Sequence, residues 1–424
     1  MSDVASAPVA APVSSGQARM WFLDQIAPPG TYNVMLTFEL PSLSPDLLRR
    51  ALATVVARHD ALRASFALGV DGIEQRTQAE PLFELEVLDG DASALADAAS
   101  RPFDLSTGPL VRACVVRRVD ADDLVAVVIH HIAADSWSLE VIASELWDSY
   151  FALAEEREVE LPEVTTSYVD YARRQHEWLE SEECRAQLEY WHARLRDAPQ
   201  AVPLPARTAV EAAPARGDSV SVVLEEPAYR GLVELTLDHD ATFFMTTVTL
   251  YACLLAAAAD VDDVVVAIPL VNRPRFELER VVGYFTNTLP FRIDGIRGVP
   301  FSKLLERVRD HALDAYANQE VPFERIVDEL APVRDLDRIP LANVAFGTEE
   351  RATSYAGRVR RLEAPAPVPV RFDLATLVVP GEHAATATFY YDASLFERAA
   401  VEEWARLYAS LARQAATSPE AVLT

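Results

Sequence analysis

The sequence predicts an α/β protein of two lobes, and three observations support this fold class. The chain has 424 residues, more than the roughly 250–300 that one hydrophobic core usually organises. Half of the residues are hydrophobic and 24% are charged, a globular balance that excludes disorder or coiled coil for most of the chain. Short β-branched runs alternate with segments of helical periodicity on both sides of a Pro/Ala-rich stretch, residues 198–217.

We therefore expect a flexible leader over residues 1–13, which are rich in Ala, Pro and Ser, an N-terminal lobe over 14–178 and a C-terminal lobe over 179–424. The first well-marked helix begins after Ser44, a favourable N-cap, with Pro45 at its first position. These signals indicate where the helix begins, and apolar residues at helical spacing predict that it continues from there.

The next clear elements are a strand and a helix in the N-terminal lobe. Residues 124–129 form an apolar, β-branched run that is typical of a strand buried on both faces. Helical periodicity begins at Ser138, so residues 130–137 are predicted to connect the strand to the helix. Any side chain in this connection lies at the end of a buried strand.

The C-terminal lobe contains one segment that imitates a membrane span. Residues 241–259 carry no charge, but four threonines dilute the segment and Asp260 follows at once. A buried helix is therefore favoured over a spanning one. A strand over residues 264–270 and a long helix over 301–318 follow.

Charge and cysteine content narrow the class of partner. Asp and Glu outnumber Lys and Arg by 65 to 38, which gives a formal net charge of -27 and disfavours nucleic-acid binding. The three cysteines, Cys114, Cys184 and Cys253, lie far apart and in no metal-like spacing. The N-terminus lacks the basic region of a signal peptide. We expect a cytoplasmic protein with reduced thiols that binds no metal, nucleic acid or membrane.

The most informative side chains are two adjacent histidines at the end of the predicted strand. Neighbouring side chains on a strand point to opposite faces, so His130 and His131 are expected to have different environments. A neutral imidazole suits proton removal from an amine or alcohol at neutral pH. Neither a GxSxG nor an HExxH motif is present. Direct transfer is therefore favoured over a covalent intermediate, although two structural histidines remain an alternative.

The segment His130–Ser136 resembles the HHxxxDG motif of the condensation-domain superfamily, the amide-forming domains of nonribosomal peptide synthetases. Related acyltransferases share this motif, but six further segments resemble the other family motifs in the expected order. They are residues 14–21, 58–66, 168–172, 282–290, 318–324 and 334–341. The resemblance covers the chain from about residue 14 to the C-terminus.

The resemblance implies two chloramphenicol-acetyltransferase-like lobes in a V shape, with a tunnel between them. The phosphopantetheine arms of a donor and an acceptor carrier protein would meet there. His131 would face this tunnel and orient or deprotonate the acceptor amine, while His130 would face the interior. Asp135 would be structural and paired with Arg273, and Asn287 would lie on a segment that reaches towards the active site from the other lobe.

One position departs from the family motif, because Ser136 stands where the family has glycine. Glycine permits a positive φ and a close approach by the pantetheine arm. A serine can narrow that approach, and its hydroxyl can cap the helix that follows. For other motif residues we favour structural roles, with Trp21 in the core, Tyr168 and Asp170 in hydrogen bonds between elements, and Pro322 at a helix start.

The implied function is peptide-bond formation in secondary-metabolite biosynthesis, such as that of antibiotics. The partners would be donor and acceptor peptidyl carrier proteins, and the enzyme would be a monomer with no bound cofactor. Two alternatives stay open, a free-standing enzyme that forms esters and a non-catalytic recruitment module. The presence of both histidines argues against the module and against heterocyclisation domains, which replace both with aspartate.

Overall fold

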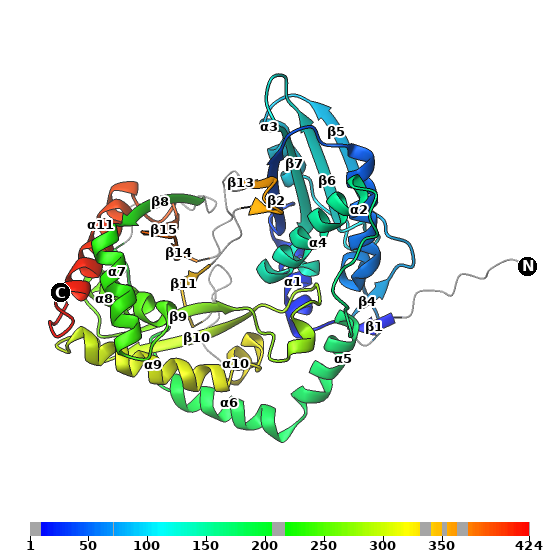
Figure 1. Cartoon of the computed structure of the whole chain (residues 1–424). Helices are drawn as coiled ribbons and strands as arrows, with labels where there is room; N and C mark the ends of the chain where they lie inside the picture. Colours follow the sequence, from blue (N-terminus) through cyan, green and yellow to red (C-terminus); the bar gives the residue numbers. More distant parts are fainter. Residues whose placement is uncertain are drawn as a thin grey trace, which may run out of the picture. The chain divides into compact units, whose positions relative to one another are not determined.

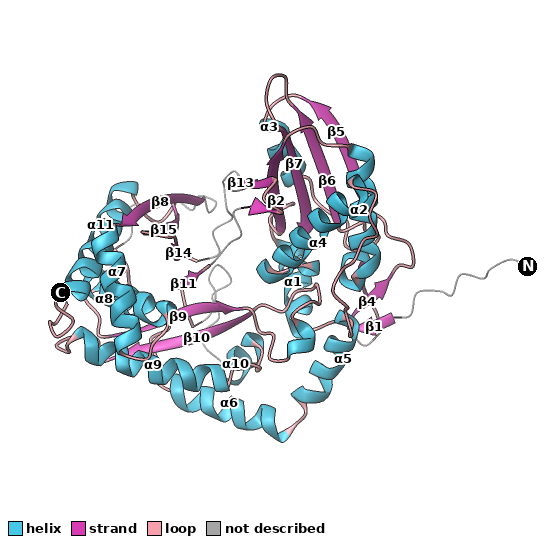
Figure 2. Cartoon of the chain, in the orientation of Figure 1, coloured by secondary structure: helices cyan, strands magenta, loops and turns pink. Residues whose placement is uncertain are grey.

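The computed structural model describes residues 10–70, 72–205, 217–330, 341–349, 354–362 and 372–423. The chain forms two compact units, each with its own sheet and helices (Figures 1 and 2). Unit 1 contains Met1–Ser181, Val271–Thr286 and Arg351–Ala366, and unit 2 contains Glu182–Leu270, Asn287–Glu350 and Pro367–Thr424. The sequence predicts one division, between residues 178 and 179. In the structure two later segments also belong to unit 1.

Unit 1 is built from a six-stranded sheet, a small three-stranded sheet and five α-helices among its described residues. Its helices are α1 (Ser15–Ile26), α2 (Pro45–Arg58), α3 (Ser93–Ser100), α4 (Ser136–Ala154) and α5 (Tyr168–Leu179), with short 3-10 turns η1 (Asp60–Arg63), η2 (His131–Ala133) and η3 (Phe276–Leu278). Its strands are β1 (Ala10–Pro12), β2 (Asn33–Leu40), β3 (Ala64–Leu68), β4 (Ile73–Thr77), β5 (Glu84–Asp89), β6 (Val111–Arg117), β7 (Asp123–His130), β12 (Ser354–Tyr355) and β13 (Val359–Leu362).

The large sheet of unit 1 has the order β12-β13-β2-β7-β6-β5, and β7 lies inside it. Every residue of β7 is buried, as the apolar run predicts. Val125 and Val127 pack in the main core with residues of α2 and α4, whereas Ala126 and Val128 pack in a second cluster with residues of α3. A strand covered on both faces needs no alternation of polar and apolar residues, which explains the continuous run.

The N-terminal end of the chain differs from the prediction of a leader over residues 1–13. The first nine residues lie outside the described residues, but Ala10–Pro12 form β1 and pair antiparallel with β4. The side-chain amide of Gln75 donates a hydrogen bond to the Pro12 carbonyl at 2.8 Å. The prediction of a flexible leader is therefore wrong for residues 10–12, because this short apolar segment forms the edge of the small sheet.

Unit 2 also combines one six-stranded sheet with helices. Its helices are α6 (Glu182–Leu195), α7 (Glu226–Asp238), α8 (Phe243–Ala259), α9 (Phe301–Ala317), α10 (Phe323–Leu330) and α11 (Arg398–Thr417). Its strands are β8 (Gly217–Leu224), β9 (Asp263–Leu270), β10 (Asn287–Asp294), β11 (Val344–Thr348), β14 (Leu374–Pro380) and β15 (Ala385–Asp392). The order β10-β9-β11-β14-β15-β8 includes parallel pairing of β11 with both of its neighbours.

The uncharged segment of the sequence is α8, a buried helix of unit 2, as predicted. Residues Met245–Ala256 are all buried, and Thr247 and Thr249 donate their hydroxyl protons to backbone carbonyls one turn earlier. Among the described residues, no single helix is long and apolar enough to cross a membrane. Helices α7 and α8 meet those criteria only as a pair, and the pair is bent by 113°.

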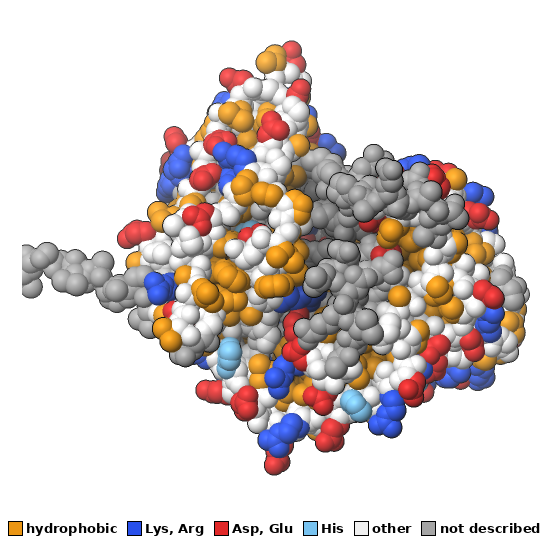
Figure 3. All heavy atoms as spheres, turned by 180° about the vertical axis from the view of Figure 1, so that it is seen from behind, with side chains coloured by type: hydrophobic (Ala, Val, Ile, Leu, Met, Phe, Trp, Pro, Cys, Tyr) orange, Lys and Arg blue, Asp and Glu red, His pale blue; other side chains and the backbone are white. Residues whose placement is uncertain are grey.

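On the face shown in Figure 3, Lys and Arg side chains lie among Asp and Glu side chains. All three cysteines, Cys114, Cys184 and Cys253, are buried.

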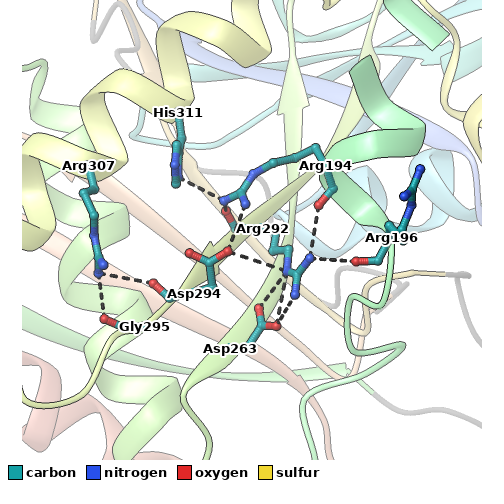
Figure 4. A network of polar contacts seen from close by, with 8 residues as sticks. All are labelled: Arg194, Arg196, Asp263, Arg292, Asp294, Gly295, Arg307 and His311. Carbon is teal, nitrogen blue, oxygen red and sulfur yellow. Dashed lines mark hydrogen bonds and ion pairs between the residues drawn. The ribbon is translucent and has the colours of Figure 1, made fainter. Parts of the chain in front are cut away.

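A polar network attaches α6 to the sheet of unit 2 (Figure 4). Arg194 of α6 donates to Asp294 of β10 at 2.9 Å and to Nδ1 of His311, on α9, at 2.9 Å. Arg292 of β10 pairs with Asp263 of β9 at 2.7 Å. Since Nδ1 of His311 accepts a hydrogen bond from a guanidinium, this network requires the imidazole to be neutral.

The network predicts a pH dependence of stability. Burial and the charge of Arg194, together with Arg307, lower the pKa of His311 from its ordinary value of 6.5, while Asp294 and Asp314 oppose the shift. Between the lowered pKa and 6.5 the unfolded chain binds more protons than the folded one, so acid favours unfolding there. We expect the free energy of unfolding, measured in urea, to fall more in the wild type than in His311→Gln as the pH drops through 6.5. Parallel pH curves for the two proteins would contradict this.

Candidate active site

The first histidine of the motif is the last residue of β7 and has no capacity left for a substrate. Only 1% of its surface is exposed. Nδ1 accepts a hydrogen bond from the backbone N–H of Ile132 at 3.2 Å, so Nε2 carries the proton and donates to Asp24 at 3.1 Å. The ring also packs perpendicular to Phe103. His130 thus ties β7 to α1, in the interior position that the motif implies.

The second histidine begins η2 and is half-buried. Its Nδ1 lies 2.7 Å from the carbonyl oxygen of Ala134, and because a carbonyl can only accept, Nδ1 carries the proton. In its neutral form the ring therefore has its lone pair on Nε2. Its backbone N–H donates to the Tyr32 carbonyl at 2.8 Å. The surroundings of His131 therefore fix both its backbone and its tautomer, a common arrangement for a histidine that accepts protons.

The aspartate of the motif forms a buried ion pair with the arginine that the resemblance assigned to it. Asp135 is 1% exposed and lies 2.9 Å from Nη2 of Arg273, whose side chain is 3% exposed. The same carboxylate caps α4 by accepting the backbone N–H of Ser138 at 2.8 Å, and it accepts the N–H of Phe285 at 3.0 Å. Burial lowers the pKa of Arg273, and the charge of Asp135 opposes that shift.

The segment Gly283–Phe285 is held from several sides, beginning with Ser138. The hydroxyl of Ser138 accepts from Arg273 at 2.8 Å and from the N–H of Gly283 at 3.0 Å. A Cβ atom at Gly283 would lie 1.8 Å from the ring of Tyr168, so no other residue fits there. Glycine at this position is a consequence of close packing.

Tyr168 links the start of α1 to the same segment. Its hydroxyl donates to the Tyr284 carbonyl at 2.5 Å and lies 2.8 Å from the hydroxyl of Ser14, the N-cap of α1. Burial raises the pKa of Tyr168 well above its ordinary value, so the hydroxyl stays protonated as a donor. This confirms the predicted hydrogen bonds between elements for Tyr168. For Asp170 the prediction is wrong, because its side chain contacts Ser167 and Arg173, within and just before its own helix.

Ser136 is the first residue of α4, it is exposed, and it is not among the residues with positive φ. The cap of the helix is Asp135 and not the Ser136 hydroxyl, contrary to one possibility raised by the sequence. The helical backbone explains why serine is tolerated, since no left-handed conformation is needed.

We expect Ser136→Gly to change the free energy of unfolding by no more than about 0.5 kcal/mol, as for other exposed substitutions. Turnover with carrier-bound substrates should change by less than about three-fold, because the side chain supports no contact of the site. Steady-state kinetics and urea unfolding check both values. A ten-fold gain in turnover would instead indicate that the hydroxyl obstructs the substrate.

Asn287 is predicted to lie on a segment that reaches towards the active site from the other lobe, and its side chain forms hydrogen bonds within unit 2. Its amide group donates to the carbonyls of Gln319 and Val321 at 2.8 and 2.7 Å. Its oxygen accepts the backbone N–H groups of Thr288 and Phe323 at 2.9 and 3.1 Å. These bonds attach the start of β10 to the turn before α10. The side chain therefore has a structural place, with its two donors and its oxygen all engaged.

The outcomes for the remaining motifs are mixed. Trp21 is partly buried and packs against the core of unit 1, close to the prediction. Pro322 directly precedes α10, as the sequence predicts. Most of the seventh motif, residues 334–340, lies outside the described residues. No group of three or more His, Cys, Asp or Glu side chains that could hold a metal is found in the part of the chain that the structure describes.

Solved structures of other proteins share this fold. The chain shares its fold with the X-domain from teicoplanin biosynthesis (TM-score 0.87, 23% identity, covering 99% of this chain and 98% of that chain). It also matches the first condensation domain of the calcium-dependent antibiotic synthetase in complex with substrate analogue 3a (TM-score 0.83, 18% identity, 99% and 98% covered). The family model for the condensation domain matches residues 9–424. The chain belongs to the condensation domain family.

Similar sequences occur within much longer proteins. The chain is 34% identical to part of the chondramide synthase of Chondromyces crocatus, over 92% of this chain and 10% of that protein. It is 33% identical to part of a phosphinothricin tripeptide synthetase of Streptomyces viridochromogenes, over 96% of this chain and 39% of that protein. The chain thus spans well under half the length of these relatives.

Proposed function

We propose that this condensation domain forms an amide bond between substrates held on two carrier proteins. The donor would be an aminoacyl or peptidyl thioester and the acceptor a carrier-bound amine, both on 4'-phosphopantetheine arms. The observation that carries the proposal is His131, whose Nδ1 is committed to Ala134 while its lone pair lies on Nε2. Membership of the family and the synthetase relatives support this chemistry.

The reaction balances without a bound cofactor. The acceptor nitrogen attacks the thioester carbonyl, a C–N bond forms, and the C–S bond breaks to release the donor thiol. Nε2 of His131 receives the proton that the amine loses and returns it to the departing sulfur. Aminolysis of a thioester is downhill, so the main task is to hold two tethered reactants in contact. A positioned base adds a further ~10²–10⁴-fold.

His130, Asp135 and Arg273 serve as structural supports in this proposal. His130 holds the end of β7 through its contact with Asp24, and the pair of Asp135 and Arg273 holds the start of α4. Both ends of the segment that contains His131 are therefore fixed within unit 1. We place the protein in the cytoplasm, where carrier proteins are loaded, and expect it to act as a monomer.

The test uses the chain with separately loaded donor and acceptor carriers. Donor carriers would bear alanyl or phenylalanyl thioesters, and acceptor carriers either an aminoacyl or the matching hydroxyacyl group. Intact mass of the acceptor carrier reports the transfer. Product only on aminoacyl acceptors is expected. Product only on hydroxyacyl acceptors would assign ester formation instead, and no transfer to either would favour the non-catalytic recruitment module.

A further inference from the structure

The ring of Tyr284 contacts the imidazole of His131. The two ring centroids are 5.0 Å apart and the planes are nearly perpendicular, at 89°. Tyr284 is 5% exposed, and its carbonyl accepts the Tyr168 hydroxyl proton at 2.5 Å. Its neighbour Gly283 is fixed by the hydroxyl of Ser138. Hydrogen bonds therefore hold the backbone at Gly283 and at the carbonyl of Tyr284, next to the ring.

The ring of Tyr284 packs against Gly16 of helix α1, where the absence of a side chain makes space for it. A Cβ atom at Gly16 would lie 2.8 Å from Cδ1 and 3.0 Å from Cε1 of Tyr284. Such distances are too short for real contacts, so any larger residue at position 16 must displace the ring. Gly16 and His131 therefore both contact one buried aromatic side chain, and the position of that side chain depends on the absence of a methyl group in α1.

We propose that Tyr284 is a positioning residue for His131, an inference that rests on the proposed function. The carbonyl of Ala134 fixes which nitrogen carries the proton, whereas contact with a neighbouring ring limits tilt of the imidazole about its Cβ–Cγ bond. The perpendicular ring of Tyr284 limits this tilt, since edge-to-face aromatic contacts have a preferred geometry. Nε2 then keeps one direction relative to the substrate, and small misplacements of a catalytic group are costly.

The test compares four single variants. Tyr284→Phe keeps the ring, Tyr284→Ala removes it, and Gly16→Ala displaces it from outside the site. Gly231→Ala is the matched control, because a Cβ at this helical glycine of unit 2 would lie 2.7 Å from the Cβ of Ala416. The control therefore introduces comparable crowding far from the histidine in sequence and in the other unit.

Two readouts separate positioning from simple loss of stability. The first is kcat and KM with loaded carriers. The second is the NMR signal of His131 in protein labelled with ¹³C and ¹⁵N histidine, assigned by comparison with His131→Ala; its ring-nitrogen shifts report the tautomer without any turnover. We expect kcat to fall about 10–100-fold in Tyr284→Ala and about 3–10-fold in Gly16→Ala, with KM nearly unchanged. Tyr284→Phe should stay within about two-fold of the wild type.

The double variant Gly16→Ala/Tyr284→Ala makes the test specific. If the methyl group acts only by pushing the ring, it should have no further effect on kcat or on the His131 signal once the ring is gone. Two independent losses of stability would instead add. Urea unfolding of every variant identifies any that fail to fold, and the milder Gly16→Ala then still decides the question.

The outcomes are distinct from those that test the reaction. A His131 signal that changes in Gly16→Ala and Tyr284→Ala, but not in Tyr284→Phe or Gly231→Ala, supports positioning even if no carrier product forms. The inference is wrong if the wild type is active and both Gly16→Ala and Tyr284→Ala keep its kcat and its His131 signal. That result would leave amide formation itself intact.

Discussion

Replacement of His131 by alanine is expected to lower kcat for transfer between carriers by about 10²–10⁴-fold, the usual contribution of a positioned general base. KM for the loaded carriers should change little, because the imidazole meets only the reacting groups. Residual turnover should remain, since holding two tethered reactants together supplies much of the acceleration by itself. Intact mass of the acceptor carrier, followed over time, measures the loss.

A second histidine provides the control for this substitution. His192 is an exposed residue of α6 in unit 2, and His192→Ala should retain the wild-type rate. Thermal unfolding should be similar for both variants, because His131 is only half-buried. Product formation that is unaffected by His131→Ala would remove His131 from the reaction, whatever the identity of the two substrates.

The elements that surround this histidine could be predicted because their signals are local. The apolar run over residues 124–129 became β7, and the Ser44 cap with Pro45 marks the start of α2, where Ser44 accepts the N–H of Leu47. The helix expected over residues 301–318 is α9, Phe301–Ala317. Hydrophobic pattern, helix caps and prolines determine structure over a few neighbouring residues, so these signals can be recognised in a single sequence.

The return of two later segments to unit 1 could not be predicted in the same way. Residues 359–362 form β13, which pairs with β2 near the start of the chain, with Arg360 opposite Glu39. Nothing in a four-residue segment indicates a partner more than three hundred positions away. The first change of unit, between Ser181 and Glu182, does lie close to the predicted boundary between residues 178 and 179. The two later changes of unit have no such sign in the sequence.

The site shows the same contrast between local and distant signals. Adjacent histidines at a strand end could be recognised in the sequence, and family resemblance supplied the pairing of Asp135 with Arg273. The partners that hold them were missed. Asp24 and Tyr284 contact the two imidazoles from distant segments, so spacing gives no sign of them. Ser138 could have been noticed, because a serine three residues after an aspartate is often part of a helix cap.

The ion pair at the base of the site is where the largest loss of stability is expected. Asp135→Asn should lower the free energy of unfolding by about 3–5 kcal/mol, because it leaves the buried Arg273 without a counter-charge. Both carboxylate oxygens of Asp135 accept hydrogen bonds. In either orientation of an asparagine side chain, its NH₂ group would therefore point at a donor in place of an acceptor. Urea unfolding measures the effect.

Two further variants show whether the charge is the cause. Glu306→Gln removes a surface pair with Lys303 and a longer contact with His239, and it should have little effect on unfolding. Asp135→Asn/Arg273→Met removes both buried charges, and it should be destabilised by about 1–3 kcal/mol less than the sum of its single variants. Additive losses would mean that the pair is not coupled. In that case the hydrogen bonds of Asp135 to Ser138 and Phe285 would carry its contribution, since these bonds do not depend on the charge of Arg273.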